Sequence, residues 1–133
     1  MKKMNPVVHF ELPAFDTNRM TEFYTKTFGW QAHKLGPEMG YYVTVDTTET
    51  DENRMTKTPG AINGGLYPRN VEMGAVYPSL VIAVDDINES AKEIVRAGGQ
   101  LLGEPADIPG IGKFVSFEDT EGNKLSILQP LMK

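Results

Sequence analysis

The chain repeats one supersecondary unit, and this repeat limits what it can fold into. An offset of 70 residues carries three positions onto three others: His9 onto Ser79, Asp16 onto Asp86, and Gly29 onto Gly99. Both segments read as a short apolar strand, an aspartate suited to capping a helix, about three helical turns and a glycine-containing end. The sequence therefore predicts a tandem duplication.

Each copy continues with three further strands. Module one is expected over residues 6–67 and module two over 78–130, with a linker at 68–77, all within a single domain of residues 1–133. Apolar alternation between turn residues predicts strands at 7–12, 31–35, 41–46, 60–67, 79–84, 100–103, 113–118 and 124–129. Pro13 is expected to end the first strand. The order β-α-β-β-β occurs twice, so the predicted class is α+β, with the two modules forming a curved mixed sheet around a cleft.

The two helices show apolar positions at helical spacing. Behind Asp16, one buried face is predicted from Met20, Phe23, Tyr24, Thr27 and Phe28. Behind Asp86, which forms a D-x-x-E capping box with Glu89, the buried stripe is predicted from Ile87, Ala91, Ile94 and Val95. The glycine-rich DIPGIGK segment at 107–113 leads into a strand, so we expect a mobile loop there and no phosphate-binding loop.

Charge and cysteine content exclude several classes of function. The net charge of −5 argues against non-specific nucleic-acid binding, which needs a basic surface. The sequence has no cysteine, which excludes disulfides and thiolate metal sites. No apolar run approaches the roughly 20 residues that span a bilayer, and residues 1–6 lack the apolar core of a signal peptide. We therefore expect a cytoplasmic protein that binds neither nucleic acid nor membrane.

The first strand presents two different faces. His9 and Glu11 alternate with Phe10 and Leu12, and successive side chains of a strand point to opposite sides. Because Phe10 and Leu12 suit packing against the helix, we expect His9 and Glu11 to face the cleft. His33 is expected to be a plain surface residue.

The most specific sequence pieces are FYTKTFGW at 23–30 and FEDTEGNKLSIL at 117–128. With the duplication, they make the chain resemble the vicinal oxygen chelate superfamily of glyoxalase I, extradiol dioxygenases and bleomycin-resistance proteins, over roughly residues 6–130. The resemblance implies the duplicated fold, a small organic ligand and a homodimer. Metal-dependent members place one ligand on the first and one on the last strand of each module, histidines first and carboxylates last.

Carried over position by position, the resemblance leaves one of these four metal ligands. His9 matches the first, Asn63 or the adjacent Gly64 stands at the second, Ser79 replaces a histidine, and Ser126 replaces a glutamate. Amide and hydroxyl oxygens bring no charge and little affinity for Zn²⁺ or Ni²⁺. We therefore expect no metal ligands and no cofactor.

The function expected from this set is small-molecule binding, serving either ligand sequestration or metal-free catalysis. His9 and Glu11 are the candidate catalytic residues, and the candidate ligand-binding residues are Trp30, Tyr42, Asn63, Ser79, Phe114 and Ser126. Aromatic side chains among them suit the walls of a ligand pocket. The alternative is a metal-dependent enzyme with rearranged ligands that include His9 and Glu11, a lyase related to lactoylglutathione lyase, an isomerase or a dioxygenase.

Overall fold

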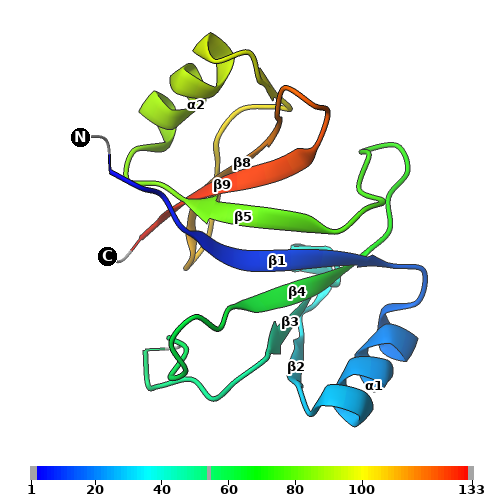
Figure 1. The fold of residues 1–133 in the computed structure, drawn as a ribbon. Helices are drawn as coiled ribbons and strands as arrows, with labels where there is room; N and C mark the ends of the chain where they lie inside the picture. The colour runs from blue at the N-terminus through cyan, green and yellow to red at the C-terminus, as the bar shows by residue number, and fades with distance from the viewer. Residues whose placement is uncertain (1–2, 54, 132–133) are drawn as a thin grey trace. The chain divides into compact units, whose positions relative to one another are not determined.

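The computed structural model describes residues 3–53 and 55–131, which form two compact units. The His9 unit comprises residues 9–78, and the Ser79 unit comprises residues from 79 onward together with the N-terminal segment up to Val8. Figure 1 follows the chain through both. Each unit is described by itself. No helix in the described part of the chain is long and apolar enough to cross a membrane.

The His9 unit is a mixed four-stranded sheet with one helix. Its elements are β1 (Val7–Ala14), α1 (Thr17–Phe28), β2 (Gln31–Lys34), the short 3-10 turn η1 (Pro37–Met39), β3 (Val43–Asp46) and β4 (Asn63–Pro68). The strand order is β2-β3-β4-β1, with β1 parallel to β4 and the other pairs antiparallel. Pro13 does not end β1, because proline's extended backbone suits a strand and only one donor is lost; it pairs with Tyr67 of β4.

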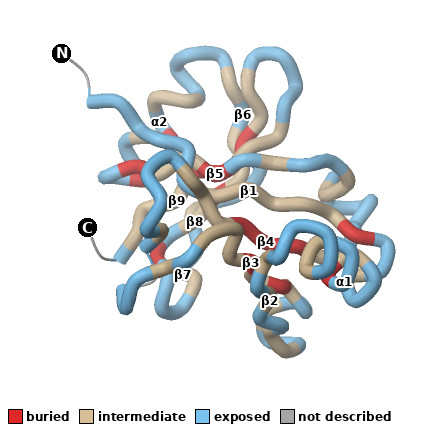
Figure 2. Tube along the Cα trace, turned by 60° about the horizontal axis from the view of Figure 1, so that its bottom comes forward, coloured by how far each residue is buried: buried red, intermediate tan, exposed pale blue. Residues whose placement is uncertain are grey.

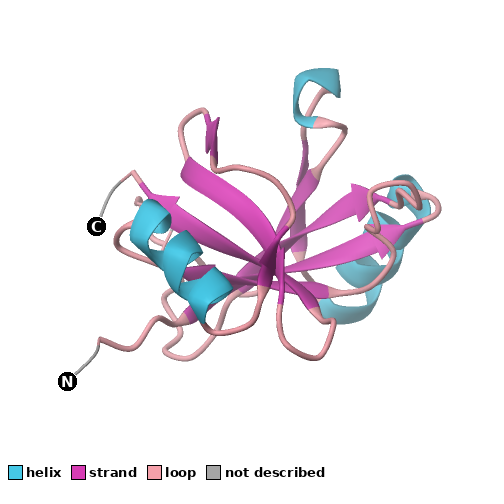
Figure 3. Cartoon of the chain, turned by 90° about the horizontal axis from the view of Figure 1, so that it is seen from above, coloured by secondary structure: helices cyan, strands magenta, loops and turns pink. Residues whose placement is uncertain are grey.

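The Ser79 unit has the same plan with one extra strand. Its elements are β5 (Ser79–Ala83), α2 (Ile87–Arg96), β6 (Gln100–Leu101), β7 (Ala106–Ile108), β8 (Gly112–Glu118) and β9 (Lys124–Pro130). The order is β5-β9-β8-β6, β5 runs parallel to β9, and β7 pairs with β8. The β-α-β-β-β repeat and the α+β class are confirmed by the element order, and Figure 3 shows the helices and strands of the chain. The loop expected at 107–113 is instead a tight turn between β7 and β8.

The helix starts confirm the duplication at the level of single residues. Asp16 and Asp86 are both N-caps with nearly the same backbone angles, φ −138° and ψ 103° against φ −134° and ψ 103°. The Asp16 carboxylate accepts from the Arg19 N–H, and the Asp86 carboxylate accepts from two N–H groups of α2. Each aspartate satisfies donors that the first helical turn leaves unpaired.

Each helix covers one face of its own sheet. In each unit an apolar core lies between the helix and the sheet. In the His9 unit the buried residues are Val43, Val45 and Leu66, packed by Phe10, Leu12, Met20, Trp30 and Ala32. In the Ser79 unit they are Val84, Ile87, Val115, Phe117 and Ile127. Buried residues lie on β3 and β4 in the His9 unit and on β8 and β9 in the Ser79 unit, and Figure 2 colours them red.

The buried stripes predicted for α1 and α2 include more residues than the helix faces that pack against the sheets. Phe23 and Phe28 are 55% and 60% exposed, and Val95 of α2 is 55% exposed. On α1 the buried residue is Thr21, which the predicted stripe omitted. The aromatic residues of α1 pack largely on one another, with the Phe23 ring edge-on to Tyr24 at 5.0 Å.

Candidate functional site

The sheet face of the His9 unit that does not carry the apolar core is polar. Paired residues of adjacent strands point to the same side, so strand register identifies the members of this face. His9 pairs with Asn63, Glu11 with Gly65, and Gly65 with Thr44. Two further pairs extend the same side to β2, His33 with Thr44 and Gln31 with Asp46. We call these eight positions the polar face: His9, Glu11, Gln31, His33, Thr44, Asp46, Asn63 and Gly65.

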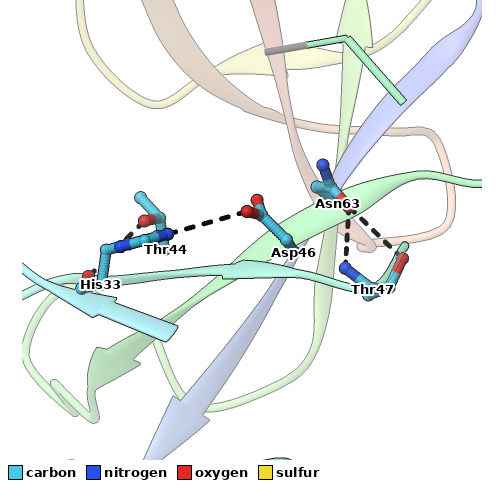
Figure 4. Close-up of polar contacts among 5 residues, drawn as sticks. All are labelled: His33, Thr44, Asp46, Thr47 and Asn63. Atoms are coloured by element: carbon cyan, nitrogen blue, oxygen red, sulfur yellow. Dashed lines mark hydrogen bonds and ion pairs between the residues drawn. The ribbon is translucent and has the colours of Figure 1, made fainter. Parts of the chain in front are cut away.

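A cavity of about 350 Å³ opens on the polar face. It is lined by Val45, Thr50 and Gly64, and by six residues of the polar face: His9, Gln31, His33, Thr44, Asp46 and Asn63. His33 Nε2 lies 3.7 Å from Asp46 Oδ2, and Asn63 Oδ1 accepts from the Thr47 N–H at 2.8 Å (Figure 4). The lining therefore offers hydrogen-bond donors and acceptors with one carboxylate.

Tyr42 joins the two candidate catalytic residues of β1. His9 Nε2 lies 2.8 Å from the Tyr42 hydroxyl oxygen, and the same hydroxyl donates to Glu11 Oε2 at 3.1 Å. His9 and Glu11 are two residues apart on one strand face, so the phenol bridges groups that cannot reach each other directly. The expectation that His9 and Glu11 share a face opposite to Phe10 and Leu12 is confirmed, because the latter pack in the core cluster.

Burial changes the protonation chemistry of this group. Burial lowers the pKa of the His9 imidazole below 6.5, because desolvation disfavours its charged form. Burial first, and then the charge and hydrogen bond of the Glu11 carboxylate, raise the pKa of the Tyr42 phenol far above its ordinary value of 10.0. At neutral pH the imidazole is therefore uncharged and the phenol keeps its proton.

Two local features bring the Tyr42 ring to this place. Gly65 leaves the room it occupies, since a Cβ built on Gly65 would lie 1.9 Å from the Tyr42 hydroxyl oxygen. Tyr41, just before it, has φ 60° and is the single non-glycine residue in the described chain with positive φ. An aromatic side chain rarely adopts this conformation, which is favoured mainly by glycine.

The other predicted site residues of the His9 unit take different places. Trp30 packs in the apolar cluster, its ring stacked on Tyr24 at 4.6 Å and tilted against Phe10 at 5.6 Å. It therefore does not join the polar face. Asn63 does, and its side-chain oxygen is already engaged by Thr47.

The three predicted residues of the Ser79 unit share one sheet face. Ser79, Ser126 and Phe114 lie opposite the face that packs on α2, since Ile82, Val115 and Ile127 fill that core. The Ser79 hydroxyl donates to the Lys124 carbonyl at 2.9 Å, and the buried Ser126 hydroxyl lies 2.9 Å from that of Ser116. Both hydroxyls are thus satisfied within their own unit.

Four polar-face residues that line the cavity were missed as site candidates: Gln31, His33, Thr44 and Asp46. The sequence pattern that could have identified them is a polar residue at every second position of β2 and β3, alternating with the apolar residues Ala32, Val43 and Val45. His33 was expected to be a plain surface residue, and its side chain is indeed 63% exposed, but it also lines the cavity.

Comparison with known proteins assigns the family. A family model described as the Glyoxalase/Bleomycin resistance protein/Dioxygenase superfamily matches residues 7–127. The chain belongs to this superfamily.

Relatives of this glyoxalase superfamily chain come from several organisms. A glyoxylase-like domain-containing protein of Didymella fabae is 29% identical over 120 residues, which are 88% of each chain. A Vibrio cholerae protein named "Probable lactoylglutathione lyase" is 26% identical over 125 residues, covering 92% of this chain and 89% of that one. A Mycobacterium bovis protein is 46% identical over 48 residues, but these are 36% of this chain and only 18% of the relative.

Solved structures share the fold at low sequence identity. The Streptomyces coelicolor methylmalonyl-CoA epimerase superimposes with a TM-score of 0.70 at 17% identity, over 98% of this chain and 97% of that one. This agreement shows the common glyoxalase fold.

The side chains at the superfamily's metal-ligand positions do not suit a divalent transition metal. Within residues 3–53 and 55–131, no group of three His, Asp or Glu side chains is placed to hold an ion. Strand register adds a reason. Ser126 pairs with Val81, the repeat equivalent of Glu11, so its counterpart on β4 is Gly65 rather than Asn63. Gly65 has no donor atom, and the Tyr42 phenol fills its side-chain space.

Proposed function

We propose that this protein binds a small, uncharged, hydrogen-bonding organic molecule in the cavity of the His9 unit, with His9 as the principal polar anchor and without a resident metal. The observation that carries the proposal is the 350 Å³ cavity lined by six polar side chains of one sheet face. Cavities of about 300–1,000 Å³ with a few convergent polar groups are typical of small-molecule sites.

The charge of the lining argues for an uncharged ligand. Among the described lining residues there is no lysine or arginine, and Asp46 contributes a carboxylate. An anionic ester such as methylmalonyl-CoA, named for the structural relatives, would meet no cationic partner in this lining. The amide groups of Gln31 and Asn63 and the hydroxyl of Thr44 suit carbonyl, hydroxyl or amide groups of a ligand.

Bound molecules can be identified without guessing the ligand. Small molecules released by denaturing the purified protein are compared by mass spectrometry between wild type, Thr44→Leu, which places a larger apolar side chain in the lining, and Thr27→Leu, a matched change on the exposed surface of α1. We expect a species retained by wild type and Thr27→Leu and depleted in Thr44→Leu. Equal spectra for all three would contradict the proposal.

Metal analysis separates the proposal from its rival. A metal-dependent lyase, isomerase or dioxygenase using His9 and Glu11 would have to hold an ion on two side chains that the Tyr42 hydroxyl bridges in this structure, and no further His, Asp or Glu side chain of the described residues completes such a site. Protein purified without chelators should therefore contain far less than one equivalent of Zn²⁺, Ni²⁺, Mn²⁺ or Fe²⁺. One equivalent of such an ion, lost in His9→Gln, would replace our proposal by the metal-dependent one.

A further inference from the structure

The hydrogen-bond order around Tyr42 fixes where the proton of His9 lies. A phenol carries a single proton, and that of Tyr42 is donated to Glu11 Oε2. The 2.8 Å contact between His9 Nε2 and the phenol oxygen can then be a hydrogen bond only if Nε2 carries the hydrogen. The neutral imidazole is consequently the Nε2–H tautomer, with the lone pair on Nδ1.

The lone pair on Nδ1 is accessible. The two ring contacts of His9, with Phe10 and Tyr42, are stacked with ring centroids 6.5 Å apart. In the described part of the chain, no buried side-chain nitrogen or oxygen lacks a partner, and no hydrogen bond involves Nδ1. Nδ1 is therefore exposed to solvent, on a residue that lines the cavity.

Two local features accompany the placement of the phenol. Gly65 leaves its side-chain space to the ring, and Tyr41 adopts a conformation unfavourable for an aromatic residue immediately before it. Unfavourable backbone conformations persist where the surrounding structure enforces them, and they cluster at functional sites.

We propose that Tyr42 and Glu11 are positioning residues that hold His9 as the Nε2–H tautomer, so that Nδ1 is the hydrogen-bond acceptor and base offered to the ligand. The role toward a ligand rests on the proposed function, whereas the tautomer is a property of the free protein. A proton moved from a ligand O–H or N–H to Nδ1 creates an imidazolium whose Nε2–H still bonds to Tyr42, with the Glu11 carboxylate offsetting the new charge.

The tautomer can be measured directly in the ligand-free protein. The sequence contains only two histidines, so long-range ¹H–¹⁵N spectra at pH 7.5 resolve both, and His33→Gln assigns them. We expect His9 of wild type to show a protonated Nε2 and an unprotonated Nδ1. Tyr42→Phe, which keeps the ring and removes the hydroxyl, and Glu11→Gln should both change this signature towards mixed tautomers.

Tyr67→Phe is the matched control. Tyr67 also lies near Glu11, but its hydroxyl donates to the Tyr77 carbonyl, so its removal should leave the His9 signature unchanged. A wild-type His9 protonated at Nδ1, or a Tyr42→Phe variant that folds with the wild-type signature, would overturn the inference. A correct tautomer in a protein whose cavity retains no small molecule would refute the proposed function and leave the positioning of His9 standing.

Discussion

Replacing Gly65 with alanine tests how tightly the Tyr42 phenol is held. The new methyl group would lie 1.9 Å from the hydroxyl oxygen and 2.0 Å from the ring carbon that carries it, so the ring must leave. The backbone of Gly65 lies outside the positive-φ region, which means that alanine itself adds no backbone strain there. The whole effect therefore comes from displacing Tyr42.

The magnitude follows from the two hydrogen bonds that the displaced phenol can no longer make. Tyr42 makes one hydrogen bond to a carboxylate and one to an imidazole, which contribute about 2–4 kcal/mol together. Alanine restricts the unfolded chain and returns about 0.5–1 kcal/mol. We expect Gly65→Ala to lower the free energy of unfolding by about 1–3.5 kcal/mol, and Tm by on the order of 10 °C. Urea unfolding and differential scanning calorimetry measure the two quantities.

A second substitution isolates the cause. In a Tyr42→Ala background the ring is already gone, so adding Gly65→Ala should be neutral or stabilising by up to about 1 kcal/mol. Gly36→Ala is the matched control, because its Cβ would meet only the flexible end of Glu38, and the change should stay within about 0.5 kcal/mol. An equal loss from Gly65→Ala in both backgrounds would refute the assignment of the space to Tyr42.

Further predictions concern protonation, capping, packing and metals. The pKa of His9 in the folded protein lies below the value of 6.5 in the unfolded chain, so the unfolded chain binds more protons between the two values. The free energy of unfolding should therefore fall as pH drops through about 6.5. Urea midpoints measured against pH should lose this slope in His9→Gln but keep it in His33→Gln. Asp86→Ala should cost about 1 kcal/mol in thermal unfolding, because two N–H groups of α2 lose their acceptor. Leu66→Ala should cost about 2–5 kcal/mol in urea, since the side chain is fully buried. Zn²⁺ or Ni²⁺ should leave Tm nearly unchanged, whereas a site filled at 100 times its Kd would add about 2.7 kcal/mol.

The repeat and the faces of β1 could be predicted because they depend on local chemistry. An aspartate before a helix caps it in both copies, and alternation along a strand separates His9 from Phe10. Helical periodicity gave the side of α1 that faces the sheet. It could not give the width of the contact, which depends on how closely the sheet approaches, and so Phe23 and Phe28 were wrongly expected to be buried.

The arrangement around Tyr42 could not be predicted for a different reason. Tyr42 was a candidate as one of several cleft aromatics, but its bridging of His9 and Glu11 depends on a turn in which Tyr41 takes positive φ. Sequence propensity disfavours that conformation for tyrosine, so no rule of turn chemistry points to it. Strand register was also needed to show that Gly65, rather than Asn63, is the counterpart of Ser126.

Gly64 and Gly65 are adjacent in β4, so at this point of the sheet the backbone carries no side chain on either face. A Cβ on Gly64 would meet the Phe10 ring at 2.5 Å, and one on Gly65 would meet the Tyr42 ring on the opposite side. Two aromatic rings thus lie against bare backbone, Phe10 on the side of the apolar core and Tyr42 on the side of the polar face. A larger side chain in place of Phe10 would contact the Gly64 backbone directly, because no side chain lies between them. A shift of that backbone would also move Gly65, against which the Tyr42 ring lies. Substitutions at Phe10 are therefore expected to disturb the Tyr42 phenol and, through it, the alignment of His9.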